Sequence, residues 1–235
     1  MANINLSEFK LCEPAPYEQP DPKALTPLII QTQRAVEKTY GPVFTLRFIN
    51  YTLQCVAQKT GNETPNNIKT LDELGAYLIS ISDKYPTIYN LMTYAGAKTE
   101  NDLQGRIGAG SRFGMIDVSR NIAKGSNLVK ERNVNLDDIV SKFRQAIVAP
   151  KLSSREMGYR KNEDRSVDIL WPNCNFSEGC KLAFDAGLLK RPDGRQSCSS
   201  GSFLTQFFKL ATGYEWDYDV LESYKPYCIH RCYMF

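Results

Sequence analysis

The residues in this sequence that could do chemistry are cysteines near the C-terminus. Five of the seven cysteines fall in the last third of the chain: Cys174, Cys180, Cys198, Cys228 and Cys232. Thiolate sulfur binds zinc well, usually with four ligands in one tetrahedral site. In a reducing compartment, clustered cysteines indicate metal or redox chemistry more often than structural disulfides. We therefore expect a zinc site in the C-terminal third.

The spacing of the last two cysteines sets a condition on that site. In a straight strand Cys228 and Cys232 share a face but lie about 13 Å apart, at about 3.3 Å per residue, too far for one ion. A turn within Ser223–Arg231, which Pro226 favours, would place Cys228 in a loop and let both cysteines reach the metal. Glu222, at the end of the preceding strand, would then be an oxygen ligand.

Two further residues bear on the chemistry. Cys198 lies where a helix is expected to begin, and there the helix dipole and the unpaired N–H groups favour the thiolate. His230 is the only histidine, and it is either an ordinary surface residue or a metal ligand. The absence of a Cys-x2-Cys pair excludes a zinc ribbon or finger. Two alternatives stay open: thiols that pack as small apolar side chains, and redox or disulfide chemistry.

The elements around these cysteines are expected to be strands and one helix. Alternating apolar residues predict a strand over Val167–Trp171 and a second strand over Tyr214–Val220. Between them, Ser199–Ala211 has helical spacing and Gly213 is placed as its C-cap. The polar stretch Lys151–Arg165 is expected to be a linker or an exposed loop.

The first 150 residues are expected to be mostly helical after a proline-rich arm. Residues 1–22 contain four prolines and are interpreted as an extended arm that does not pack. Thr70 and Glu73 form a capping box that begins one helix. Apolar spacing predicts the helices themselves over 22–40, which Gly41-Pro42 ends, over 43–59, which Gly61 caps, and over 70–81 and 135–147, with a short one near 88–94.

Together these patterns predict an α/β (α+β) fold with helices packed on a small antiparallel sheet, a helical N-terminal half and a strand-helix-strand-strand C-terminal part. The expected organisation is an arm over 1–22 and one domain over 23–235, helical from 23 to 150 and metal-bearing from 166 to 235. No run of about 20 apolar residues could span a bilayer, and the polar N-terminus lacks a signal-peptide layout. We therefore expect a cytoplasmic protein.

Nucleic acid is not the favoured partner. The net charge is only +3, and the basic run 112–132 is interpreted as a solvated helix face in preference to a phosphate-binding one. The glycine-rich stretch 105–114 has neither the Walker nor the dinucleotide order, so it is not expected to bind phosphate. Because the arm could clasp a neighbouring subunit, a homo-oligomer also stays open.

The C-terminal pattern resembles the 4-vinyl reductase domain family, whose members are small-molecule-binding domains related in fold to a vesicle-tethering subunit family. The resemblance rests on these residues in this order: Cys198-Ser199-Ser200-Gly201, Thr212-Gly213, Glu222, Cys228, Cys232 and Phe235. It implies that Cys198, Glu222, Cys228 and Cys232 bind zinc beside a ligand pocket. In a second alignment Cys228 matches the last family cysteine, and Cys174 and Cys180 complete the site. An aminothiazoline-carboxylate hydrolase-like family has a similar cysteine-rich tail.

These observations lead to one main functional expectation and two alternatives. The resemblance implies a binding domain for a hydrophobic or aromatic small molecule, or a tetrapyrrole, with zinc as a structural support. The first alternative is an enzyme that depends on the metal or on Cys198 as a nucleophile. The second alternative is an assembly or nucleic-acid-binding protein.

Overall fold

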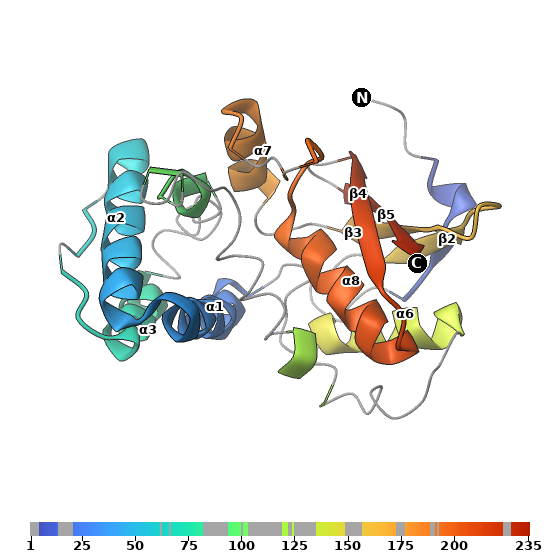
Figure 1. Ribbon diagram of the computed structural model, residues 1–235, viewed down its shortest axis with the longest axis horizontal. Helices are drawn as coiled ribbons and strands as arrows, with labels where there is room; N and C mark the ends of the chain where they lie inside the picture. The colour runs from blue at the N-terminus through green and yellow to red at the C-terminus, as the bar shows by residue number, and fades with distance from the viewer. Residues whose placement is uncertain are drawn as a thin grey trace. The chain divides into compact units, whose positions relative to one another are not determined.

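The fold is described from a computed structural model, and it is of the α+β class (Figure 1). The structure describes residues 5–13, 21–61, 63–65, 67–81, 94–99, 101–102, 119–121, 124, 135–148, 157–172, 177–188, 191, 193–222 and 227–235. Among these residues, no helix is long and apolar enough to cross a membrane.

The chain divides into two compact units, each built from separated segments. The sheet unit comprises Met1–Pro20, Ser119–Cys174 and Ser200–Phe235, and the helical unit comprises Asp21–Val118 and Asn175–Ser199. The expected single domain over 23–235 stays a prediction.

The sheet unit is built on five antiparallel strands in the order β1-β2-β3-β5-β4. Their bounds are β1 Lys10–Leu11, β2 Gly158–Lys161, β3 Val167–Pro172, β4 Trp216–Glu222 and β5 Tyr227–Met234. The predicted strands at 167–171 and 214–220 are confirmed as β3 and β4. The prediction of a linker over 151–165 is wrong at its end, because Tyr159 of β2 pairs with Ile169 of β3 and Lys10 of β1.

Two helices cover one face of this sheet, α6 (Leu136–Val148) and α8 (Ser199–Thr212) (Figure 1). Phe143 of α6 and Phe203 of α8 both pack against Trp171 of β3, with ring centroids 5.4 and 6.3 Å away. Both helices were predicted, and Asn135 caps α6 as expected, since its side chain accepts a hydrogen bond from the Asp137 N–H.

The N-terminal segment packs on the opposite face of the sheet. The short helix η1 (Leu6–Glu8) leads to Phe9, which is buried against Leu170 and Ile229. The expectation that the arm does not pack is therefore wrong for residues 6–11. The sequence gives no local signal for this packing, because Leu170 and Ile229 are both distant from Phe9 in the chain.

The helical unit contains α1 (Leu25–Tyr40), α2 (Pro42–Thr60), α3 (Leu71–Ile81) and α7 (Ser177–Asp185), with a short helix η2 (Pro22–Ala24) before α1. Helices α2 and α3 agree with the predicted ranges to within a residue, whereas the helix predicted from Pro22 begins as η2 and continues as α1. Both α2 and α3 pack on α1 (Figure 1). Residues 94–99 are also helical, whereas most of the expected helix near 88–94 lies outside the described residues.

Candidate functional site

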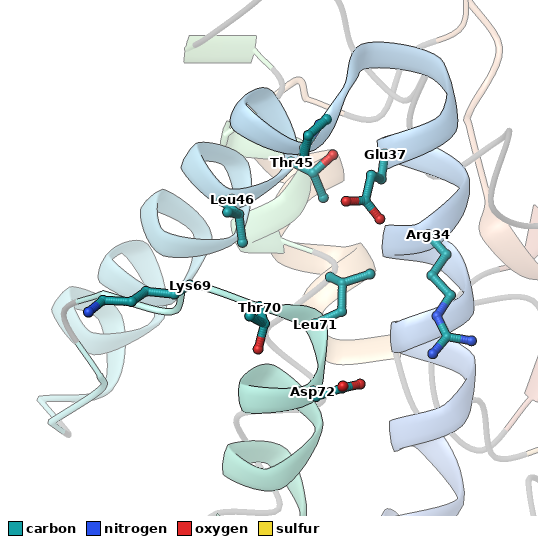
Figure 2. A pocket seen from close by; sticks show the side chains of 9 residues that line it. Arg34, Glu37, Thr45, Leu46, Lys69, Thr70, Leu71 and Asp72 are labelled. Atoms are coloured by element: carbon teal, nitrogen blue, oxygen red, sulfur yellow. The ribbon is translucent and has the colours of Figure 1, made fainter.

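A recess lies where the end of α1, the start of α2 and the start of α3 meet in the helical unit (Figure 2). Its volume is about 320 Å³, at the lower end of the range for small-molecule sites. The lining residues are Arg34, Glu37, Pro42, Thr45, Leu46, Lys69, Thr70, Leu71 and Asp72. The recess is thus lined by charges of both signs around a small apolar patch.

A single glycine joins the two helices that form one wall. Gly41 has φ 83° and ψ 164°, a conformation that is essentially limited to glycine. Its N–H closes α1 by donating to the Glu37 carbonyl at 2.8 Å, and Pro42 opens α2 at once. The Thr45 hydroxyl donates to the Gly41 carbonyl at 3.0 Å. These bonds hold Glu37 and Thr45 on adjacent sides of the recess.

The segment that precedes α3 forms the other wall of the recess, and Asn50 of α2 holds this segment in place. Its side-chain amide donates to the Ile68 carbonyl at 2.9 Å and accepts from the Ile68 N–H at 2.7 Å. The same amide also donates to the Leu46 carbonyl at 2.8 Å. Because Ile68 is itself buried, this contact anchors the residues that precede α3 to the middle of α2.

The predicted N-cap Thr70 orients the start of α3 and is confirmed, whereas Glu73 reaches back to Lys69, one residue before the cap. The Glu73 N–H donates to the Thr70 hydroxyl at 3.1 Å, and the Lys69 N–H donates to the Glu73 carboxylate at 2.7 Å. Thr70 and Glu73 therefore hold Leu71 and Asp72 in a fixed first turn.

The charged groups of the recess are not paired with one another. Among the residues that the structure describes, the side chains of Arg34, Glu37, Lys69 and Asp72 form no ion pair. Glu37 directs its carboxylate into the recess, whereas Lys69 extends away from it (Figure 2). Two acidic groups, Glu37 and Asp72, and one basic group, Arg34, thus border one small volume.

The predicted cysteine site does not form in the way that the sequence suggested. The expectation that Cys228 lies in a loop is wrong, because Cys228 belongs to the continuous strand β5, Tyr227–Met234. Residues 223–226, the rest of the expected turn before β5, lie outside the described residues. Cys228 pairs with Trp171 and Cys232 with Val167, so both cysteines face α6 and α8. At about 3.3 Å per residue they lie about 13 Å apart and do not fit one ion.

The other predicted ligands fall elsewhere. Glu222 pairs with Ile229, which faces the opposite side of the sheet from Cys228 and Cys232. Cys180 and Cys198 belong to the helical unit, and Cys174 lies outside the described residues. No group of three histidine, cysteine, aspartate or glutamate residues within the described ranges could hold a metal ion.

The described C-terminal cysteines are arranged as packed thiols. Cys180, Cys198, Cys228 and Cys232 are all buried, and no described cysteine forms a disulfide. Burial raises the pKa of the Cys232 thiol far above its ordinary value, with a smaller contribution from Asp168. Cys198 does lie directly before the first residue of α8, as predicted. The packed-thiol alternative accounts for this burial.

His230 is buried in the core of the sheet unit and is not a surface residue. Its ring lies 6.2 Å from the Tyr218 ring, edge to face, on the side of the sheet that the helices cover. Burial lowers the pKa of His230 from 6.5 to about 4, so the imidazole is neutral at pH 7.

Asp168 is the most buried charged group of the sheet unit that the structure describes. Its carboxylate accepts hydrogen bonds from Arg160 at 2.7 Å, Asn162 at 3.0 Å and Arg231 at 2.8 and 3.1 Å. Burial alone would raise the pKa of Asp168, but these hydrogen bonds outweigh it and lower the pKa. With both oxygens engaged, Asp168 stabilises the sheet and offers no lone pair to a substrate.

Comparison with known proteins finds no relative: no protein-family model, curated protein or solved structure matches the chain. Function is therefore argued from the geometry of the site. Around the recess, the sequence carries two recognisable signals, the Gly41-Pro42 helix stop and the Thr70 capping box. Both were interpreted as helix boundaries, because nothing local shows that two such boundaries meet in space.

Proposed function

We propose that the protein binds a small polar molecule in the recess between α1, α2 and α3. The observation that supports this proposal is the set of unpaired charges around a volume of about 320 Å³. A recess bordered by ionic groups favours a charged or strongly polar ligand, because an apolar ligand would desolvate those groups without replacing their hydrogen bonds. The hydrophobic or tetrapyrrole ligand implied by the resemblance is the competing proposal.

A thermal-shift screen of the full chain separates the two ligand types. The screen contains amino acids, amines, carboxylates and sugar phosphates beside aromatic hydrocarbons and a porphyrin. A ligand at 100 times its Kd should raise Tm by about 5–10 °C for a chain of this size. A shift with polar compounds supports the recess, and a shift with only the aromatic set or the porphyrin contradicts it.

Two substitutions on α3 test whether the ligand binds in the recess. Leu71→Phe fills the recess and should abolish the shift, because Leu71 lines it. Ile79→Phe lies on the same helix at an exposed position outside the lining and should leave the shift unchanged. Equal shifts in both variants would place the ligand elsewhere.

A zinc ion on the C-terminal cysteines is a separate proposal, and its support is the resemblance alone. Because Cys228 and Cys232 lie too far apart along β5 to share an ion, a zinc ion would use one of these cysteines but not both. Elemental mass spectrometry of Cys228→Ala and Cys232→Ala tests this narrower form. Loss of zinc in one variant only agrees with it, and loss in both variants contradicts it.

A further inference from the structure

The positions of Arg34 and Glu37 on α1 indicate which polar molecules the recess would take. The two residues are three positions apart, a spacing that lets opposite charges meet on a helix. Here they point to different parts of the recess: the Glu37 carboxylate lies near the start of α2, and Arg34 extends toward the first turn of α3 (Figure 2). The recess therefore has a negative part and a positive part.

Apolar side chains lie between these two parts. Leu46 and Leu71 line the recess and are half-buried, and Leu71 lies between Glu37 and Asp72 in the close view (Figure 2). A short aliphatic group would cover both leucines and remove apolar surface from water, at about 25 cal/mol per Å². The Thr45 hydroxyl is already donated to the Gly41 carbonyl, so it can only accept from a ligand.

The positive part combines Arg34 with the start of α3. The first N–H groups of a helix lack partners within the helix and favour an anion. Asp72 lies in the same turn and opposes an anion there. A variant that neutralises Asp72 should therefore strengthen the binding of an anionic group, and it serves as a control.

We propose that the recess takes a zwitterionic small molecule with an aliphatic body, of the amino-acid class. Its ammonium group binds the Glu37 carboxylate, its carboxylate binds the Arg34 guanidinium, and its aliphatic part lies on Leu46 and Leu71. This assignment rests on the proposed function, since it names the ligand class of the same site.

Calorimetric titration with three matched probes tests the assignment on the full chain. The probes are leucine, 3-methylbutylamine, which lacks the carboxylate, and 4-methylpentanoate, which lacks the ammonium group. Leucine should bind at least about tenfold more tightly than either single-charge probe. An equal Kd for leucine and one single-charge probe would refute the zwitterion assignment and keep the recess as a binding site.

Substitutions at the charged residues assign the two ends of the ligand. Glu37→Gln should weaken the binding of leucine and of the amine and leave that of the carboxylate probe unchanged. Arg34→Gln should weaken the binding of leucine and of the carboxylate probe and leave that of the amine unchanged. Asp72→Asn should tighten leucine a few-fold, and Arg47→Gln, on an exposed part of α2 outside the lining, should change nothing. No heat from any of the three probes at about 10 mM would contradict this assignment, and the thermal-shift screen with the other polar compounds would then decide the proposed function.

Discussion

Gly201 allows α8 to lie directly on the ring of Tyr218. A Cβ atom at position 201 would lie 2.5 Å from the ring carbons of Tyr218, closer than real contacts permit. Gly201→Ala should therefore lower the free energy of unfolding by about 2 kcal/mol through overpacking. Urea denaturation measures the change. A variant with the wild-type midpoint would show that α8 does not approach β4 this closely.

The matched control is a glycine inside another helix. At Gly75 of α3 an added Cβ would lie 3.8 Å from Ile30, which is ordinary contact. Gly75→Ala should be neutral or should stabilise the protein by up to about 1 kcal/mol, because alanine is the better helix former.

The neutral, buried His230 makes stability depend on pH. In the unfolded chain its pKa is near 6.5 and in the folded protein it is about 4, so the unfolded state binds more protons between these values. The free energy of unfolding is therefore highest above pH 6.5 and should fall by about 3 kcal/mol as the pH drops to 4.

Urea denaturation at pH 7, 5.5 and 4.5 measures this dependence. Carboxyl groups titrate in the same range, so His230→Phe supplies the reference. The free energy of unfolding of the wild type, relative to that of His230→Phe, should fall as the pH drops below 6.5 and stay constant above pH 6.5. An identical pH dependence in both proteins would contradict a buried, neutral histidine.

At the scale of elements, most helices could be predicted because their start and stop signals are local. Gly41-Pro42, Gly61 and the Thr70 capping box each mark a boundary that the structure confirms. The interior strand β5 was expected only as the last strand of the C-terminal part, and its bounds could not be predicted in the same way. Cys228, Ile229 and His230 are all buried, so the alternation that marks a half-exposed strand is missing.

Strands β1 and β2 show the same limit. β2 has the sequence Gly-Tyr-Arg-Lys, which has little intrinsic strand preference. It forms because β3 lies beside it and because Gly158 lets Leu11 approach; an added Cβ there would lie 2.8 Å from the Leu11 side chain. Such pairing depends on tertiary contacts and leaves no pattern in the segment itself.

Replacing the glycine in the turn between α1 and α2 tests how much this turn contributes to stability. Gly41 and Gly61 both have positive φ and open space around the Cβ position, so alanine there costs only backbone energy. Gly41→Ala should cost about 2–3 kcal/mol, because ψ 164° places it outside the left-handed helical region. Gly61→Ala, at φ 69° and ψ 8°, should cost about 1 kcal/mol.

Ligand affinity separates these two variants further. Because Gly41 sets the angle between α1 and α2, Gly41→Ala should weaken leucine binding several-fold. Gly61 caps the far end of α2, so Gly61→Ala should leave the Kd unchanged. An unchanged Kd in Gly41→Ala would mean that the α1–α2 turn does not shape the site.

At the scale of the whole molecule, the last two cysteines, Cys228 and Cys232, and the recess belong to different units. From the sequence, the C-terminal cysteines are the expected site, because their residue type alone indicates metal chemistry. Within the sheet unit, Cys228 and Cys232 pack under α6 and α8, a position set by strand register. The recess comes from three helices whose polar residues look like ordinary exposed positions in the sequence, so only the tertiary arrangement identifies it.

The central claim is that the recess of the helical unit binds a small zwitterion. Titration of uniformly ¹⁵N-labelled full-length protein with leucine, followed by amide chemical shifts, tests this claim most directly. Saturable shifts should gather in the segments 34–46 and 69–72, which contain the lining residues of the recess, and should disappear in Leu71→Phe. Shifts that gather on β5 around Cys228–Cys232, or no saturable shift at all, would contradict it.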